Sequence, residues 1–352
     1  AGDNISGDSS AAGGGVDIVR TTVDYSAAGD QVEILVAATG TAAIDLTGNA
    51  SANTLAGNDG INILDGGAGA DVLAGGLGND TYYLDNAADN ISGESSAAGG
   101  GIDIVRTMVD YSAASDYVEV LVAAIGTAAI DLTGNTLINT LTGNDGANIL
   151  NGGTGADILR GGLGNDSYVV DNAGDDIDGE SSASAGGIDA VTSSITWSIA
   201  SDYVENLTLA GTAAIDGTGN KLANTITGNA GANTILGAAG ADVLTGGAGA
   251  DKFAYAAAPE STLAAMDRIT DFTRGTDKLD LSRLDGNAGL TGHQDFTFIG
   301  SKAFSANATG QLRFALESGK VMLYGSTDAD ATAEFAVHVA GATTLGSSDF
   351  VF

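Results

Sequence analysis

The chain has 352 residues, with 45 acidic against 12 basic side chains and a formal net charge of -33 at pH 7. A surface this acidic repels nucleic acid and anionic membrane, and its natural counterpart is a multivalent cation. The 54 glycines with a single proline exclude collagen, and the absence of cysteine excludes disulfides and thiolate metal sites.

No apolar run approaches the roughly 18 residues of a membrane-spanning helix, so we expect no membrane insertion. The first residues lack the basic and apolar regions of a signal peptide. The opening Asp3-Asn4-Ile5 matches the interior stretch Asp89-Asn90-Ile91. We therefore expect the chain to begin within a repeat unit, as the C-terminal part of something longer.

A long repeat of 86 residues organises the first two thirds of the chain, since Asp3, Asp89 and Asp175 occupy equivalent places. Each unit opens with a polar segment, continues through alternating strands and closes with a glycine-rich block. The third unit is one residue shorter between Glu205 and Asp216. The alternating segments predict parallel coils longer than those of the glycine-rich blocks.

Aromatic residues recur at one place in the three units, as Tyr25, Tyr111 and Trp197. Recurrence favours packing between coils, and a sugar-stacking platform is the alternative. Acidic residues recur as well, and we expect those at Glu33, Glu119 and Glu205 to be solvated corners of the coils. Two further groups of acids are possible cation sites: Asp85, Asp89 and Glu94, and Asp171, Asp175 and Glu180. No glycine cage surrounds either group.

The glycine-rich blocks each contain four nine-residue repeats, or nines, and span Gly48–Tyr83, Gly134–Val169 and Gly219–Ala254. All twelve nines begin with Gly, carry Asn or Asp at place six and carry Leu, Ile, Tyr or Phe at place eight. Asp and Gly are common turn formers, which would explain one such stretch but not twelve in phase. A strict period of nine is typical of a parallel β-roll that binds calcium.

Each place in a nine has a physical role. Glycines at the first places allow positive φ and a tight turn whose carbonyls point inward. With the place-six side chain, these carbonyls form an all-oxygen cage suited to Ca²⁺. Places seven to nine form a three-residue strand, with place eight pointing between two facing sheets. The fold class we predict is all-β: a right-handed parallel β-roll or β-helix solenoid with a C-terminal β capping domain.

Two nines make one coil, so place six stacks on place six of the next nine but one. The predicted pairs are Asn53 with Asp71, Asn62 with Asp80, Asn139 with Asp157, Asn148 with Asp166, Asn224 with Asp242 and Asn233 with Asp251. Every predicted ion therefore contacts a carboxylate, and about six or more Ca²⁺ ions are expected.

The predicted calcium ligands are the place-six side chains and the turn glycines of these coils. They are Asn53, Asn62, Gly66, Gly67, Gly69, Asp71, Gly75, Gly76, Gly78, Asp80, Asn139, Asn148, Gly152, Gly153, Gly155, Asp157, Gly161, Gly162, Gly164, Asp166, Asn224, Asn233, Gly237, Gly240, Asp242, Gly246, Gly247, Gly249 and Asp251.

The character of the sequence changes at Pro259, and we divide the chain into a solenoid at 1–258 and a capping domain at 259–352. Pro259-Glu260-Ser261-Thr262 and the following LAAM predict a short helix with Pro in its first turn. Five alternating stretches then predict strands: FTFIG, QLRFALE, KVMLYG, EFAVHVAG and the terminal DFVF. An open solenoid end exposes strand edges, so a β cap is expected here.

Residues 246–352 resemble the C-terminal domain of the serralysin family of secreted metalloproteases, through GGAGADKFAY, PES, DRITDFTRGTDKLDLS and the ending Asp349-Phe350-Val351-Phe352. The upstream units are similar to long RTX repeat proteins of Gram-negative bacteria. The resemblance implies calcium binding through Asp71, Asp80, Asp157, Asp166, Asp242 and Asp251. It also implies that the ending is the uncleaved signal of a type I (ABC) secretion apparatus and that the protein is secreted to the extracellular space.

No catalytic constellation is found, so we do not expect this chain to be an enzyme. The chain has only two histidines, His293 and His338, and no H-E-x-x-H; we expect His338 on the surface face of its strand. Asp328-Ala329-Asp330 resembles the start of a calcium loop but is better interpreted as a hairpin turn.

Three functions remain open on the sequence alone. The first is a calcium-driven folding and export module. The second is a surface-layer or adhesin segment whose solenoid is the working part, with a bacterial cell surface or a glycan as partner. The third is the export tail of an upstream secreted enzyme.

Overall fold

The structure is a computed structural model that describes residues 15–94, 100–180 and 186–352. The chain divides into two compact units, 1–187 and 188–352, each described here by itself. Helical structure among the described residues is confined to two short 3-10 turns, η1 (Ala258–Glu260) and η2 (Ser347–Asp349). The predicted all-β parallel solenoid with a β cap is confirmed. The predicted start within a repeat, at Asp3, lies outside the described residues.

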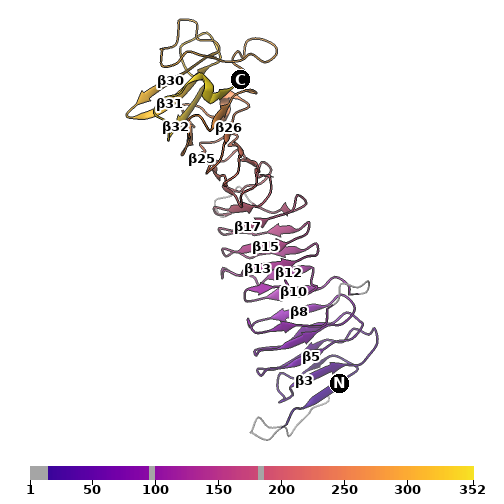
Figure 1. The fold of residues 1–352 in the computed structure, drawn as a ribbon. Coiled ribbons are helices and arrows are strands. Elements are labelled where there is room, and N and C mark those ends of the chain that lie inside the picture. The colour runs from indigo at the N-terminus through magenta and orange to yellow at the C-terminus, as the bar shows by residue number, and fades with distance from the viewer. Residues whose placement is uncertain (1–14, 95–99, 181–185) are drawn as a thin grey trace. The chain divides into compact units, whose positions relative to one another are not determined.

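The first unit is a stack of short parallel strands (Figure 1). Its strands are β1 (Ile18–Thr21), β2 (Tyr25–Ser26), β3 (Ile34–Ala37), β4 (Leu46–Thr47), β5 (Thr54–Ala56), β6 (Ile63–Asp65), β7 (Val72–Ala74), β8 (Thr81–Leu84), β9 (Asn90–Ile91), β10 (Ile104–Thr107), β11 (Tyr111–Ser112), β12 (Val120–Ala123), β13 (Leu132–Asn135), β14 (Thr140–Thr142), β15 (Ile149–Gly153), β16 (Ile158–Arg160), β17 (Ser167–Val170) and β18 (Asp176–Ile177). The even-numbered strands from β2 to β8 pair in order and continue through β10, β12, β14 and β16 to β18. The odd-numbered strands form the facing layer in two runs, β1 to β9 and β11 to β17.

Within a glycine-rich block, two nines make one coil. Leu55 pairs with Leu73 and Leu64 with Tyr82, so neighbouring strands in a sheet are separated by two nines in the chain. The strands begin at place seven of each nine, as the period predicts. Place eight is buried in all twelve nines, at Leu55, Leu64, Leu73, Tyr82, Leu141, Leu150, Leu159, Tyr168, Ile226, Ile235, Leu244 and Phe253.

The coils between blocks depart from this period. Thr81 pairs with Ile104, Ile104 with Val120 and Val120 with Thr140. The first and last of these steps are longer than two nines, as the alternating segments predict, whereas the middle step is shorter, so the prediction is wrong there. The buried positions still alternate with partly or fully exposed ones, so the sheet from β2 to β18 remains continuous while the turns change length.

The recurring aromatic side chains pack within the coils, as their repetition predicts. Tyr25 and Tyr111 are half-buried, and their hydroxyls donate to Asp30 Oδ2 at 2.8 Å and to Asp116 Oδ2 at 2.7 Å. Trp197 is half-buried at the equivalent place. Each aromatic ring is therefore part of the wall of the solenoid.

The second unit continues the same architecture and then closes it. Its strands are β19 (Ala190–Ser193), β20 (Trp197–Ser198), β21 (Asn206–Leu209), β22 (Gly217–Thr218), β23 (Thr225–Thr227), β24 (Thr234–Leu236), β25 (Val243–Thr245), β26 (Lys252–Ala254), β27 (Asp267–Ile269), β28 (Lys278–Asp280), β29 (Thr297–Phe298), β30 (Gln311–Glu317), β31 (Lys320–Ser326), β32 (Phe335–Val339) and β33 (Phe350–Val351). One sheet runs from β19 through β21, β23 and β25 to β27, and the other from β20 through β22, β24 and β26 to β28.

The last solenoid strands do not end as free edges. β32 pairs in parallel with β27 and in antiparallel fashion with β31, while β33 pairs in parallel with β28. The five strands predicted after Pro259 are all present. The predicted helix is shorter than expected, because only Ala258–Glu260 is helical and Ser261 is already extended. The cap thus occupies edges that would otherwise pair with other chains.

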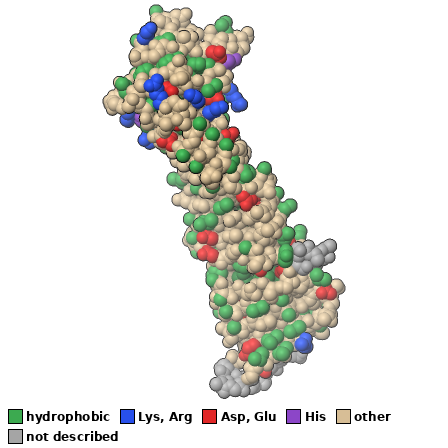
Figure 2. All heavy atoms as spheres, in the orientation of Figure 1, with side chains coloured by type: hydrophobic (Ala, Val, Ile, Leu, Met, Phe, Trp, Pro, Cys, Tyr) green, Lys and Arg blue, Asp and Glu red, His purple; other side chains and the backbone are tan. Residues whose placement is uncertain are grey.

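Positive charge collects on the capping region (Figure 2), where seven of the 12 lysines and arginines lie after residue 258. They are Arg268, Arg274, Lys278, Arg283, Lys302, Arg313 and Lys320. The repeat units before residue 258 therefore carry most of the excess acid.

One turn contains a residue other than glycine in the left-handed backbone conformation. Ala238 has φ of +67°, at the place where the equivalent turns have Gly67 and Gly247 with φ of +75° and +88°. Holding an L-residue in the left-handed region costs about 1–2 kcal/mol. Replacing it with glycine removes that cost, but glycine loses more chain entropy on folding, which offsets about half of the gain. Ala238→Gly should therefore stabilise the calcium-loaded protein by about 0.5–1 kcal/mol, measured by urea unfolding.

The neighbouring Ala239→Gly is the matched control, because Ala239 is exposed and has no positive φ. It should destabilise by a similar amount. Equal effects of the two substitutions would contradict the role assigned to this turn.

Candidate metal centre

The asparagines at place six of each block are engaged at both ends of their amides. Asn53 Oδ1 accepts the Asn49 N–H at 2.7 Å, and its Nδ2 donates to Val32 O in the preceding coil at 2.7 Å. The same two bonds recur at Asn62, Asn139, Asn148, Asn224 and Asn233. These side chains brace their own turn and tie it to the coil before, with one lone pair left on Oδ1.

The structure brings together all six predicted Asn–Asp pairs. The backbone N–H of each Asn donates to Oδ1 of the Asp 18 residues later, at distances from 2.6 Å for Asn53 to 2.9 Å for Asn233. The place-six side chains therefore form a ladder along the solenoid, with one rung in each turn.

The second oxygen of the aspartates is the feature that points to a cation. Among the residues that the structure describes, Oδ2 is buried and has no hydrogen-bond partner in Asp71, Asp80, Asp157, Asp242 and Asp251. An ionised carboxylate oxygen held away from water without a partner is costly, and a bound cation removes that cost. These residues therefore fit a hard cation with oxygen ligands.

The places beside the aspartates have no room for a residue larger than glycine. A Cβ on Gly66 or Gly75 would clash with Oδ2 of Asp71 or Asp80. A Cβ on Gly67 or Gly69 would clash with backbone carbonyl oxygens of the turn stacked against it, those of Asn49 and Ser51. Carboxylate and carbonyl oxygens thus crowd the space between stacked turns, as the predicted cage requires.

The ladder has a further acidic rung that the nine-residue pattern does not contain. The backbone N–H groups of five place-six aspartates donate to later carboxylates at 2.7–3.1 Å: Asp71 to Asp89, Asp80 to Asp103, Asp157 to Asp175, Asp242 to Asp267 and Asp251 to Asp277. The conceivable extra sites at Asp89 and Asp175 therefore join the predicted ones. Sequence reasoning missed Asp103, Asp267 and Asp277, because they follow the place-six aspartates by 23, 25 and 26 residues, whereas the register of 18 residues reaches only Asp89 and Asp175.

Other acids also accept backbone N–H groups of a neighbouring coil. Glu33, Glu119 and Glu205, expected as solvated corners, accept the backbone N–H of Asp17, Asp103 and Asp189 through Oε2, each at 2.9 Å. The expectation of free corners was wrong, because a carboxylate can satisfy the N–H groups of an adjoining coil where no strand pairing does.

The third block is completed by the capping segment. Where the other blocks have Tyr82 and Tyr168, this one has Phe253, which lacks a hydroxyl to accept the N–H of the nearby turn glycine. Asp271 takes over, with its carboxylate accepting the N–H groups of Gly246 at 2.9 Å and Gly247 at 2.8 Å. The DRITDFTRGTD segment therefore supplies the acids that close the last turns.

Burial raises the pKa of the aspartates on this ladder. The pKa of Asp71, Asp157, Asp242 and Asp251 rises to about 6, and that of Asp80 to about 7, with desolvation as the largest cause in each. Neighbouring carboxylates add to the rise, as Asp89 does at Asp71 and Glu94 at Asp80. Without a cation, these carboxyl groups in the folded turns therefore keep their protons to a higher pH than a free aspartate does.

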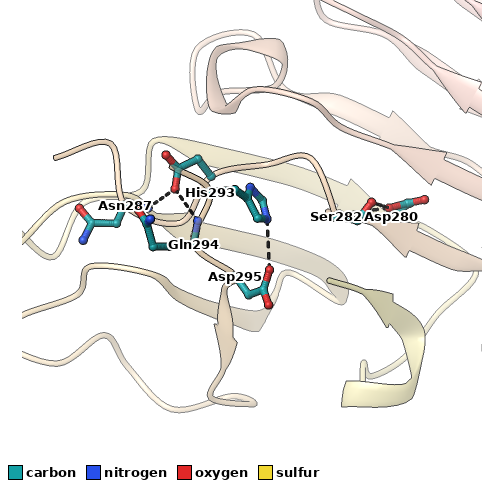
Figure 3. Close-up of polar contacts among 7 residues, drawn as sticks. Asp280, Ser282, Asn287, His293, Gln294 and Asp295 are labelled. Atoms are coloured by element: carbon teal, nitrogen blue, oxygen red, sulfur yellow. Dashed lines mark hydrogen bonds and ion pairs between the residues drawn. The ribbon is translucent and has the colours of Figure 1, made fainter. Parts of the chain in front are cut away.

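The remaining chemistry-bearing residues form no catalytic cluster within the described part of the chain. His293 lies in an exposed loop with Nε2 at 3.1 Å from Asp295 Oδ1 (Figure 3). His338 is half-buried on β32, and burial lowers its pKa. Asp328 and Asp330 lie in the connection between the antiparallel strands β31 and β32, as the hairpin interpretation predicts. No described helix is long and apolar enough to cross a membrane.

A chain of stacked parallel coils with glycine turns and buried aspartates is an RTX-type repeat region. The model of the family described as Peptidase M10 serralysin C terminal matches residues 11–352, so the chain belongs to this family. That family is the C-terminal, non-catalytic part of serralysin-type proteases, whose repeat domains bind calcium and which Gram-negative bacteria secrete. A search of curated proteins found no match.

Adding one methyl group at Gly75 tests the cage. Gly75→Ala places a Cβ against the Asp80 carboxylate, and the backbone there needs no positive φ. We expect a loss of about 1–3 kcal/mol in saturating calcium, measured by thermal unfolding. Gly29→Ala is the control, since a Cβ there meets no atom within 4 Å. Equal effects at both positions would contradict the cage.

The raised aspartate pKa values predict an unusual pH dependence for the calcium-free protein. The folded state holds protons up to about pH 6–7, whereas unfolded aspartate loses them near pH 4, so this stabilisation is present at low pH and disappears as pH rises through 6–7. In EGTA, far-UV circular dichroism should therefore show more β-structure at pH 5 than at pH 8, where the protein is largely disordered. In saturating calcium this trend should flatten. β-Structure in EGTA that increases towards pH 8 would contradict the burial of these groups.

Proposed function

We propose that this chain is an extracellular calcium-binding RTX repeat region that folds when Ca²⁺ binds, after export by a type I secretion apparatus. The observation that carries the proposal is the repeated aspartate with one buried oxygen lacking a hydrogen-bond partner, at Asp71, Asp80, Asp157, Asp242 and Asp251 of the described chain. All ligands are oxygens, which is the preference of Ca²⁺. The ions lie between stacked turns, held by the predicted glycines and place-six residues.

The energetics suit a folding switch. With dissociation constants around 10⁻⁴ M, each ion adds roughly 1.4 kcal/mol at about 1 mM calcium. Six ions then contribute about 8 kcal/mol, comparable to the whole stability of a domain. At the submicromolar calcium of a cytosol this contribution vanishes. A chain rich in glycine and acid then stays unfolded, because its conformational entropy and the repulsion between its carboxylates oppose folding.

The place of the C-terminus supports export before folding. Phe350 and Val351 pair with β28, the Phe350 ring lies 4.8 Å from that of Phe298, and the buried Asp349 is paired with Arg274 at 3.0 Å. Asp349 and Phe350 are thus buried in the folded protein, whereas Phe352 is exposed. An exporter that recognises Asp349 and Phe350 therefore meets the chain before calcium folds it.

A second function is compatible with the same region. Because the matched family is the non-catalytic part of serralysin-type proteases, this chain suits the role of export tail for a secreted enzyme. Its three glycine-rich blocks also suit a structural role on a cell surface, in which the solenoid is the working part. Calcium-dependent retention on cells would distinguish the structural role from the tail.

Calcium titration followed by far-UV circular dichroism tests the proposed function. The protein in excess EGTA should be largely disordered, and β-structure should appear cooperatively with a midpoint around 10⁻⁴ M calcium. Mg²⁺ at the same concentration should not substitute, since it demands a regular octahedron and retains its waters. β-Structure that persists unchanged in EGTA would refute the proposal.

A further inference from the structure

A group of three carboxylates lies where the first glycine-rich block ends. Asp80, Glu94 and Asp103 each offer one oxygen, and these oxygens lie within 4.8 Å of one another. Asp80 and Asp103 are 0% and 1% exposed, and Glu94 is half-buried. Only Asp80 belongs to a nine, so the glycine pattern does not predict this group.

Hydrogen bonds fix all three side chains in place. Asp103 Oδ1 accepts the Asp80 N–H at 2.7 Å, and the Asp103 N–H donates to Glu119 Oε2 at 2.9 Å. The hydroxyl of the fully buried Tyr82 donates to Glu94 Oε1 and accepts the Gly75 N–H at 2.9 Å. The carboxylates are therefore positioned by the protein itself, which lowers the entropy that a ligand would cost.

Two of the oxygens in this group have no protein partner. Asp80 Oδ2 and Glu94 Oε2 are buried without a hydrogen bond among the described residues, and the ion pairs found there involve none of the three acids. Asp80 itself is fully buried, so water does not compensate its charge. Three carboxylates this close repel one another unless a cation lies between them.

We propose that Asp80, Glu94 and Asp103 bind one hard divalent cation, Ca²⁺ in an extracellular medium, in a three-carboxylate site tighter than the glycine-turn sites. The inference rests on the proposed function and adds to it a site with a different construction. More ligand charge and a rigid cage both raise calcium affinity. The ligands are all oxygens, without imidazole or thiolate, which disfavours transition metals.

The position of the site gives the ion a structural task. The coil from Asp80 to Asp103 runs 23 residues, five more than the coils within a block, and Glu94 lies in this longer connection. An ion held by all three residues fastens the long coil to the end of the block. A similar anchor recurs in the next unit, where the Tyr168 hydroxyl donates to Glu180.

Calcium binding by equilibrium dialysis of the full chain tests the site. Glu94→Gln keeps the shape of the side chain and an acceptor for Tyr82 but removes one charge. In the calcium-folded protein we expect wild type to bind one ion more tightly than the others, and Glu94→Gln to bind that ion at least on the order of tenfold more weakly. The other ions and the circular dichroism spectrum at saturating calcium should be unchanged.

Two further variants make the result specific. Tyr82→Phe removes the hydroxyl that holds Glu94 and should weaken the same ion. It also removes the acceptor of the Gly75 N–H, so its circular dichroism spectrum at saturating calcium is compared with that of wild type. Glu317→Gln is the control, because Glu317 also accepts a tyrosine hydroxyl, that of Tyr324 at 2.9 Å, but belongs to neither acidic group found in the described chain. It should bind calcium as wild type does.

The outcomes separate this inference from the proposed function. If wild type binds calcium and Glu94→Gln binds the same number of ions with the same affinities, the three-carboxylate site is refuted and the repeat sites stand. If wild type binds no calcium, both proposals fail. If Glu317→Gln loses an ion to the same extent as Glu94→Gln, the effect is one of general charge and the site is refuted.

Discussion

The bond from a backbone N–H to a carboxylate in the next coil is the interaction on which the solenoid depends. A turn of four glycine-like residues leaves its N–H groups without strand partners, and burial would make each one costly. Just after the turn, the N–H of the place-six residue donates to the place-six carboxylate of the following coil, as that of Asn53 does to Asp71. Stacking, strand register and the geometry of the oxygen cage all follow from this single contact.

The same contact also creates an electrostatic problem. Aspartate accepts the bond more strongly than asparagine, because its oxygen is charged. It then has a second oxygen to satisfy, and at Asp71 and Asp80 that oxygen is buried without a partner among the described residues. Asparagine avoids the problem, since the amide of Asn62 donates to Ile44 O. The first coil of each block therefore carries asparagines and the second carries aspartates, whose charge an ion can compensate.

Much of the fold could be predicted from the sequence, because a strict period fixes both turn and strand. The strands of all twelve nines, their register of two nines and the buried place-eight residues follow from the glycine at place one and the apolar residue at place eight. The linking coils could not be predicted in the same way. Their lengths depend on which carboxylates accept an N–H across the turn, as Glu119 accepts that of Asp103. No nine-residue period runs through these segments, so the sequence does not predict the register of their strands.

The residues of the candidate site could likewise be predicted only where they lie within the nine-residue period. Asp71 and Asp80 lie within the period and were predicted, whereas Asp103, Asp267 and Asp277 lie in segments where the spacing changes. Glu94 was grouped with Asp85 and Asp89 and not with Asp80 and Asp103, because its link to Tyr82 joins residues 12 apart on a turn of irregular shape. The cap was predicted from strand edges, but its two separate attachments, β32 on β27 and β33 on β28, required the structure.

The most direct measurement is an anomalous difference map from crystals grown in millimolar calcium. The account predicts calcium peaks within about 2.3–2.6 Å of Oδ2 in the buried aspartates, with turn carbonyl oxygens completing each coordination shell. Turns without peaks, in which the Asp71 and Asp80 carboxylates point to bulk water, would contradict it.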